Sequence, residues 1–233
     1  MRSDSRCNEL NLFISDLQAI RWAIEKGVHI ISISWGFRED VPSIASALND
    51  ALKAGILIFA SASNTGANYP IAFPARLSGL FCIGASDGLG YPSSFNPPFA
   101  GEEKYSALGE AVLGDCPKTL CNESGYNREE QTIRRDGTST AAPIAAGIAA
   151  LFIDYTWQFM DGNGAWDYEN MRKLFTWISK ATIEKDYRYL APWSLFGAFV
   201  DSRTEIDNIL VSPVGIWLHN RNADVSQNRI NDG

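Results

Sequence analysis

The stretch "RRDGTSTAAPIAAGIAALFI", residues 134–153, joins a polar run to an alanine-rich segment that is typical of a buried helix. A Gly-Thr-Ser-Thr sequence stands at the junction, with Ser139 at the mouth of the predicted helix. A serine in this position is usually an N-cap, because its side chain can accept a hydrogen bond from an unpaired backbone N–H. A helix start also offers free N–H groups and the positive end of a dipole, which suit a developing oxyanion. Ser139 is therefore either a cap or a nucleophile.

The residues upstream alternate between helical and strand-like patterns. We expect one helix from Ser15, where Ser15 and Gln18 form a capping box, to Gly27, and a second helix within residues 40–55. Apolar runs of the buried-strand type occupy residues 28–34, 56–61 and 80–86. This rhythm predicts an α/β fold, a three-layer sandwich with a mainly parallel sheet and right-handed crossovers.

The second half of the chain is less regular. Residues 87–138 are rich in Gly, Pro, Asn and charge, so we expect a long surface loop with one or two short strands. A helix follows from Thr140 to about residue 160, with Pro143 tolerated in its first turn. Asp167 is predicted to cap another helix that runs to about residue 180. Its inward-facing residues are Met171, Leu174, Phe175 and Ile178. No strong periodicity appears from Tyr187 onward.

Composition and charge narrow the classes of function. The net charge is −7 and the sequence pI about 4.9, which argues against nucleic-acid or anionic-membrane partners. We expect no membrane-spanning helix, because no run of about 18 apolar residues is evident. The first residues lack the apolar stretch of a secretory signal, so we expect an intracellular protein if Met1 is the true start.

The four cysteines do not form a metal-binding pattern. Cys82 lies in an apolar strand-like run and is predicted to be a core thiol. Cys116 and Cys121 are close enough in sequence to close a small disulfide loop, although a reducing compartment disfavours one. No pair with zinc spacing occurs. We therefore expect neither a metal site nor a cofactor.

A second polar feature follows the strand-like run at residues 56–61. The sequence "FASASNTG", residues 59–66, ends in Ser-Asn-Thr-Gly, where Asn64 either builds a turn or donates its amide into a cleft. The order of this segment, the preceding "HIISISWG" (29–36) and the later Gly-Thr-Ser-x-Ala-x-Pro resembles the subtilisin-like serine proteases, the subtilases. The resemblance covers residues 17–152, the C-terminal part of that catalytic domain, in a style similar to fungal members.

The resemblance implies roles for particular residues. It makes Ser139 the nucleophile, with Asn64 and the Ser139 backbone N–H as the donors that stabilise the oxyanion. It implies a peptide or protein substrate bound between two walls, formed by Ser34, Trp35 and Gly36 on one side and by Ser61, Ala62 and Ser63 on the other. It also implies a cis proline at Tyr69-Pro70. The family usually has Gly where Ser63 stands, and Trp35 is bulkier than its common counterpart.

The general base that the serine needs is not evident. A subtilase-like order places an Asp and a His before the serine. Of the two histidines, His29 lies at the wrong end of a predicted strand, and His219 follows the serine. The family's Asp strand and His helix precede the segment that begins here at Leu17. We therefore expect that the N-terminal strands of the fold are missing, that one sheet edge is open, and that the isolated chain has little protease activity.

These expectations divide the chain into an N-terminal remnant (1–16), a partial subtilase catalytic domain (17–186) and a C-terminal extension with a flexible tail (187–233). The leading function is serine endopeptidase, with a missing N-terminal half as a partner. A non-catalytic subtilase fold that binds peptides or proteins is the alternative. An α/β-hydrolase with Ser139, an Asp such as Asp201 or Asp207, and His219 fits poorly, because "EEQTIRRD" (129–136) is no buried strand.

Overall fold

The computed structural model of the chain describes residues 3–99, 104–116, 131–159, 166–181 and 187–193. Its helices are α1 (Ser3–Glu25), α2 (Pro42–Lys53), α3 (Thr138–Phe159) and α4 (Tyr168–Ile178). Its main sheet contains β1 (Ile30–Ile33), β2 (Leu57–Ser61), β3 (Phe81–Ser86), β4 (Lys104–Leu108), β8 (Tyr187–Leu190) and β7 (Ser179–Ala181), in that spatial order. All pairs are parallel except β7 with β8.

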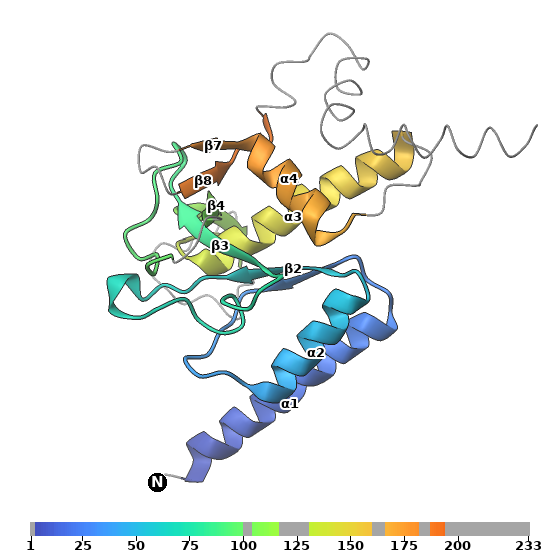
Figure 1. Ribbon diagram of the computed structural model, residues 1–233. Helices are drawn as coiled ribbons and strands as arrows, with labels where there is room; N and C mark the ends of the chain where they lie inside the picture. Colours follow the sequence, from blue (N-terminus) through green and yellow to red (C-terminus); the bar gives the residue numbers. More distant parts are fainter. Residues whose placement is uncertain (1–2, 100–103, 117–130, 160–165, 182–186, 194–233) are drawn as a thin grey trace, which may run out of the picture.

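Helices cover both faces of this sheet (Figure 1). The first apolar layer lies between the sheet and the helices α3 and α4. It includes the stacked rings of Phe59 and Phe81, whose centroids are 4.8 Å apart. The second layer lies between the sheet and the helices α1 and α2, around Ile44, Leu48 and Ile58. The predicted three-layer α/β fold with a mainly parallel sheet is therefore confirmed.

Helical periodicity predicted α2 and α4 well. The buried residues of α2 are Ile44, Ala47, Leu48 and Ala51. The buried residues of α4 are Met171, Leu174, Phe175 and Ile178, as expected, and the side chain of Asp167 caps the helix by accepting from the Asn170 N–H at 2.8 Å. In both helices the apolar spacing of three and four residues faces the sheet, which is why sequence alone located them.

Two predictions near the start of the chain are wrong. The first helix begins at Ser3, so Ser15 lies inside α1 and does not cap it. The run at residues 28–34 forms a four-residue strand whose residues are mostly part-exposed, not a buried strand. Its position explains the difference, because β1 is at the edge of the sheet and no described strand pairs with its outer side.

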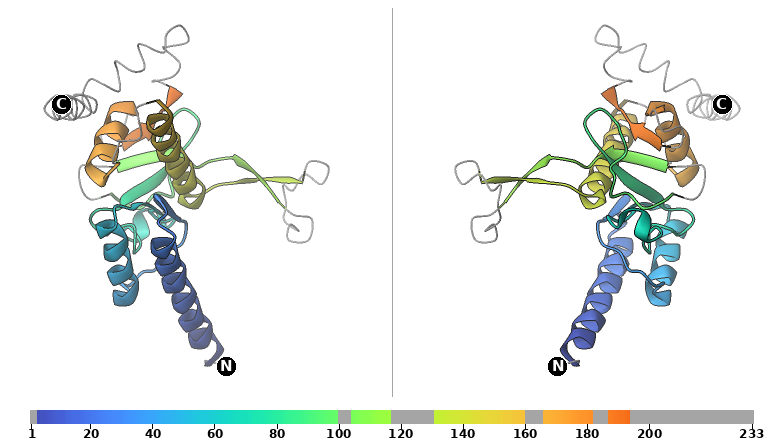
Figure 2. Two further views of the ribbon diagram at one scale, coloured as in Figure 1. Left: turned by 90° about the vertical axis from the view of Figure 1, so that its right-hand side faces the viewer. Right: turned by 90° about the vertical axis from the view of Figure 1, so that its left-hand side faces the viewer.

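Several strands carried too little pattern to be predicted individually. β4 and β8 are both in the main sheet, where Lys104 pairs with Tyr187. β5 (Val112–Asp115) and β6 (Thr132–Arg135) form an antiparallel hairpin that projects away from the sheet (Figure 2). The expectation of a surface loop with one or two short strands at residues 87–138 is therefore wrong in part, because three strands occur there and β4 is buried in the main sheet. The domain limits at residues 16 and 186 stay a prediction; α1 runs through the first and β8 lies just beyond the second.

The described cysteines are in different environments. Cys82 packs against the layer beneath α1 and α2, and this burial raises the pKa of its thiol to about 12, although the residue keeps some exposed surface. Cys116 is disulfide-bonded, and Cys121, its expected partner, lies outside the described residues.

One described helix, α3, is long and apolar enough to cross a membrane, contrary to the expectation from sequence. That test considers length and composition only. The packing of α3 against the sheet is the behaviour of a core helix.

Candidate active site

Three chain segments meet at one edge of the sheet. Ser34 follows the end of β1, and residues 62–66 follow the end of β2. The start of α3 reaches the same edge, where its residues contact both strand ends. Because the strands are parallel, their carboxyl ends share this edge, which is the usual place for a site in an open α/β sheet.

Gly137 lies at the centre of the convergence, directly before α3. Its φ is +151°, and a Cβ at this position would lie 3.0 Å from both Asn64 Nδ2 and Ser139 Oγ. Any larger residue would therefore be strained, and both groups would have to shift slightly to make room for it. The amide nitrogen of Asn64 and the hydroxyl of Ser139 thus flank one point in space.

Contacts with Thr138 orient the Asn64 amide. Its Oδ1 accepts hydrogen bonds from the Thr138 N–H at 2.8 Å and from the Thr138 hydroxyl at 3.0 Å. With the oxygen engaged by two donors, the NH₂ end of the amide is turned toward Gly137 and Ser139. Asn64 is therefore not only a turn residue, because its side chain caps α3 and presents a donor beside Ser139.

Thr138 is a site residue that the sequence reasoning missed. It is 1% exposed, and its hydroxyl also accepts from the Ser63 N–H at 3.2 Å. The chain of hydrogen bonds runs from Ser63 through Thr138 to Asn64, so one buried hydroxyl links both residues to the start of α3. A threonine directly before the candidate nucleophile was visible in the sequence, but its partners are 74 and 75 residues away.

Ser63 adopts a backbone conformation that favours glycine. Its φ is +134°, well outside the usual range for a residue with a Cβ. This explains physically why a glycine would be expected before Asn64. The Ser63 side chain bonds locally, to the Thr65 hydroxyl at 3.1 Å.

Ser139 is the second residue of α3, so it is not the N-cap. Among the described residues, neither its N–H nor its hydroxyl has a hydrogen-bond partner. Its carbonyl oxygen accepts a hydrogen bond from the Ser34 hydroxyl at 2.8 Å. A part-exposed hydroxyl next to a free N–H and the Asn64 amide is the arrangement that an acyl-transfer oxyanion requires.

The segment after β1 is held against the segment that follows residue 70. Phe37 and Phe73 exchange two backbone hydrogen bonds, at 2.7 and 2.9 Å. Gly36 lies so close to this segment that a Cβ would be 2.9 Å from the Ala72 Cβ. Trp35 packs against the apolar layer of α1 and α2, with its ring 5.3 Å from that of Phe37.

The second predicted wall joins the same assembly. The Ala72 N–H donates to the Ala62 carbonyl at 2.9 Å, so the segment after β2 is tied to the one that contacts Gly36. Ser61 is only 6% exposed, at the end of β2. Ser34, Trp35 and Gly36 are therefore connected to Ala62 through residues 72 and 73.

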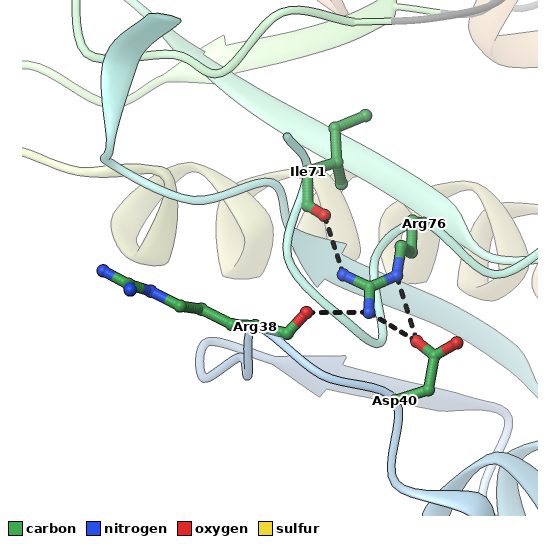
Figure 3. A network of polar contacts seen from close by, with 4 residues as sticks. All are labelled: Arg38, Asp40, Ile71 and Arg76. Carbon is green, nitrogen blue, oxygen red and sulfur yellow. Dashed lines mark hydrogen bonds and ion pairs between the residues drawn. The ribbon is translucent and has the colours of Figure 1, made fainter. Parts of the chain in front are cut away.

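Arg76 connects the same loops on the surface (Figure 3). Its Nε donates to the Asp40 carboxylate at 3.0 Å, and its two Nη groups donate to the carbonyls of Arg38 and Ile71 at 2.9 and 3.1 Å. One guanidinium thus bridges the segment after β1 and the segment before residue 76. The Arg38 side chain lies over the Tyr69 ring, 4.1 Å from its centroid.

The expected cis proline is in a different place. The cis peptide bond joins Phe73 to Pro74, not Tyr69 to Pro70. Both dipeptides occur within six residues, so matching by sequence selected the wrong one. The backbone pairing of Phe73 with Phe37 brings Phe73-Pro74 next to the segment that follows β1, whereas Tyr69 and Pro70 are exposed.

No general base is placed beside Ser139 by the described residues. His29 precedes β1, at the opposite end of the strand from Ser34, and its ring packs on Trp157 at 4.8 Å. Trp157 is near the far end of α3, about 27 Å along the helix from Ser139 at 1.5 Å per residue. His219 lies outside the described residues. Within the described part of the chain, no group of three or more His, Cys, Asp or Glu could hold a metal ion.

A serine at the start of an apolar helix, next to a side-chain amide at the carboxyl edge of a parallel sheet, defines an α/β protein with a serine-hydrolase type of site. The model of the subtilase family matches residues 7–189, and the chain belongs to this family of serine proteases. The α/β-hydrolase interpretation is therefore wrong, and β6, which precedes Ser139, is mostly exposed rather than buried.

Relatives with known names agree with this assignment. The chain is 34% identical to the subtilisin-like protease het-Q2 of Podospora anserina over 148 residues, which are 60% of this chain and 38% of that protein. It is 36% identical to a thermostable alkaline protease of Halalkalibacterium halodurans over 134 residues, 58% of this chain and 34% of that protein. The chain therefore spans well under half the length of these relatives.

Solved structures show the same fold. The prenylagaramide maturation protease PagA superposes with a TM-score of 0.60 at 26% identity, covering 73% of this chain and 58% of that structure. The PatG macrocyclase in complex with peptide superposes with a TM-score of 0.59 at 29% identity, covering 74% and 48%.

Proposed function

We propose that this chain contributes the nucleophile and the oxyanion-binding groups of a serine endopeptidase. Ser139 Oγ attacks the carbonyl carbon of a peptide bond, and a base takes the hydroxyl proton. The oxyanion is stabilised by Asn64 Nδ2 and the Ser139 N–H. Transfer of the proton to the departing amine leaves an acyl-enzyme on Ser139, which water then hydrolyses. The observation that carries this proposal is the fixed orientation of the Asn64 amide beside Ser139.

The substrate we propose is an extended peptide. It would lie between the segment Ser34-Trp35-Gly36 and the segment Ser61-Ala62-Ser63, which the Phe37–Phe73 pairing holds at a set separation. The similarity to a macrocyclase solved with a peptide supports this class of substrate. The packing of Trp35 on the apolar layer means that this wall presents backbone more than the indole ring.

We further propose that the base and its carboxylate come from a polypeptide segment that this chain does not contain. Two surfaces next to the site support the idea. The outer side of β1 pairs with no described strand, although parallel sheets are normally covered. Along α3, apolar and small residues are exposed at helical spacing: Pro143, Gly147, Ala150, Leu151 and Trp157. Such a segment would add a strand to β1 and cover α3.

Chemical rescue tests the proposal. The purified chain is mixed with an activated ester, with and without imidazole as a free base, and release of the alcohol is followed. If Ser139 is the nucleophile, imidazole accelerates release beyond its own solution rate, and Ser139→Ala removes the excess. The control Ser46→Ala, in an exposed serine of α2, should leave it unchanged. An equal imidazole rate in Ser139→Ala would contradict the proposal.

A binding module without catalysis is the second candidate. It is favoured by the absence of a partner for the Ser139 hydroxyl among the described residues. Under this hypothesis the chain binds extended peptides with an affinity that Ser139→Ala does not change, and no ester turnover depends on imidazole.

A further inference from the structure

We infer that Ser34 is a positioning residue for Ser139, which it holds through the helix backbone rather than by touching the substrate with its hydroxyl. The inference rests on the proposed role of Ser139 as the nucleophile. It starts from the Ser139 carbonyl at the beginning of α3, which lacks the hydrogen-bond donor that a helix normally supplies.

The donor is missing because residue 143 is a proline. In an α-helix the carbonyl of residue 139 would accept a hydrogen bond from the N–H of residue 143. Pro143 has no N–H, so this bond cannot form. A proline in the first turn of a helix removes no helical hydrogen bond. Because α3 begins at Thr138 and not at Thr140, Pro143 lies beyond the first turn and does remove one.

Ser34 supplies the missing donor. Its hydroxyl lies 2.8 Å from the Ser139 carbonyl oxygen and donates to it across the gap between β1 and α3. The contact links the end of an edge strand to the peptide group that follows the candidate nucleophile. Since an unpaired carbonyl would be solvated or would shift to find a donor, removal of the hydroxyl should loosen this turn.

Contacts of the neighbouring residues hold Ser34 in position. The two residues that follow it are held by the packing of Trp35 on the apolar layer and by the close approach of Gly36 to Ala72. On the other side of Ser139, Asn64 holds the Thr138 N–H. The first turn of α3 is thus fixed from β1 and from β2, with Ser139 between the two contacts.

A double-mutant cycle with Pro143 tests the inference. Ser34→Ala should lower the Tm of the full chain by about 2–4 °C, whereas Ser34→Thr, which keeps the hydroxyl, should restore most of it. In a Pro143→Ala background residue 143 regains its N–H, so Ser34→Ala should there cost less than about 1 °C. Ser32→Ala, at an exposed serine two residues earlier in β1, is the matched control and should be additive with Pro143→Ala.

A peptidyl boronic acid, which forms a tetrahedral adduct with a serine, provides a readout of positioning. Ser34→Ala should weaken its binding about five- to tenfold in the original background, with recovery in Pro143→Ala. If Ser34→Ala and Pro143→Ala are additive in both Tm and boronate binding, the inference is overturned. If no variant binds the boronate while the Tm cycle is non-additive, the contact is established and the nucleophile role of Ser139 fails. If Ser34→Ala does not fold, folding of the double variant supports the inference and its failure to fold overturns it.

Discussion

Helices α2 and α3 lie on opposite faces of the same sheet, and different contacts stabilise them. The buried residues of α2 follow a three- and four-residue spacing, and its other face is polar. α3 is apolar on most sides: all of its alanines except Ala150 belong to the apolar layer on the sheet, while Leu151 and Trp157 are 48% and 51% exposed. α2 begins after Val41 without a side-chain cap, whereas Asn64, in the segment after β2, caps α3.

The difference separates a structural helix from the helix that carries the site. The position of α2 depends on its own pattern and on burial of one face. The start of α3 depends on groups from the ends of β1 and β2, because its residues must be held at fixed places next to Ser139. The exposed side of α3 carries apolar and small residues next to the polar pair Asp154 and Gln158, and it is the surface that the proposed additional segment would cover.

The largest expected change in unfolding free energy comes from a leucine of α2, which we compare with a leucine of α3. Leu48→Ala in α2 should cost about 2–5 kcal/mol, because Leu48 is fully buried and its removal leaves a cavity. Leu151→Ala in α3 should cost less than about 1 kcal/mol in the isolated chain, because half of that side chain is already exposed. Urea unfolding of both variants measures the difference. Similar costs would show that α3 is covered in solution, for example by self-association.

Alanines on the two sides of α3 give the next effect. Ala145 is fully buried against the sheet, so Ala145→Leu should destabilise the chain by about 1–3 kcal/mol through overpacking. Ala150 is exposed on the same helix, and Ala150→Leu should change stability by less than about 0.5 kcal/mol. Chemical unfolding of the pair tests whether close approach of α3 to the sheet is required; an equal response at both positions would argue against it.

Two substitutions of Asn64 separate its cap from its donor. Asn64→Leu removes the acceptor of the buried Thr138 N–H and should cost about 1–3 kcal/mol. Asn64→Asp keeps an acceptor and should keep most of that stability. Both should weaken binding of a peptidyl boronic acid, since neither has the NH₂ group.

For the oxyanion donor of subtilisin, a member of this family, the loss in turnover is about 10²–10³-fold. The boronate affinity of the two Asn64 variants is therefore measured beside their unfolding free energies. Strong boronate binding by Asn64→Asp would show that Asn64 does not stabilise the oxyanion, although its role as the cap of α3 would stand.

The smallest effect concerns the strain that supports the start of α3. Ser63→Gly should stabilise the chain by about 0.5–1 kcal/mol, because glycine adopts a φ of +134° without a Cβ clash. The loss of the side-chain contact with Thr65 and the greater freedom of glycine in the unfolded chain offset part of the gain. Thermal unfolding measures the change, with Ser94→Gly in an exposed serine as the control. A lower Tm in Ser63→Gly would show that the Thr65 contact outweighs the strain.

The elements that sequence predicted have strong local patterns. Ile44 and Leu48 in α2, and Leu174 and Phe175 in α4, follow helical spacing, and the largely apolar run at β2 is typical of a central parallel strand. β4 and β8 were not located, because their alternation is short and their pairing partner is about 80 residues away in the chain. The start of α1 and the edge position of β1 were wrong for a similar reason: both depend on neighbours.

By itself the sequence determined the α/β class and the apolar layers, since these depend on composition and local spacing. The roles expected of Ser139 and Asn64 came from the resemblance to the subtilases. Tertiary structure alone decided how the site is assembled. Two hydrogen bonds at the site join residues that are far apart in the chain. The bond from the Thr138 N–H to Asn64 spans 74 positions, and the bond from Ser34 to the Ser139 carbonyl spans 105. No local pattern encodes such contacts, because they form only when the ends of β1 and β2 and the first turn of α3 meet at one edge of the sheet.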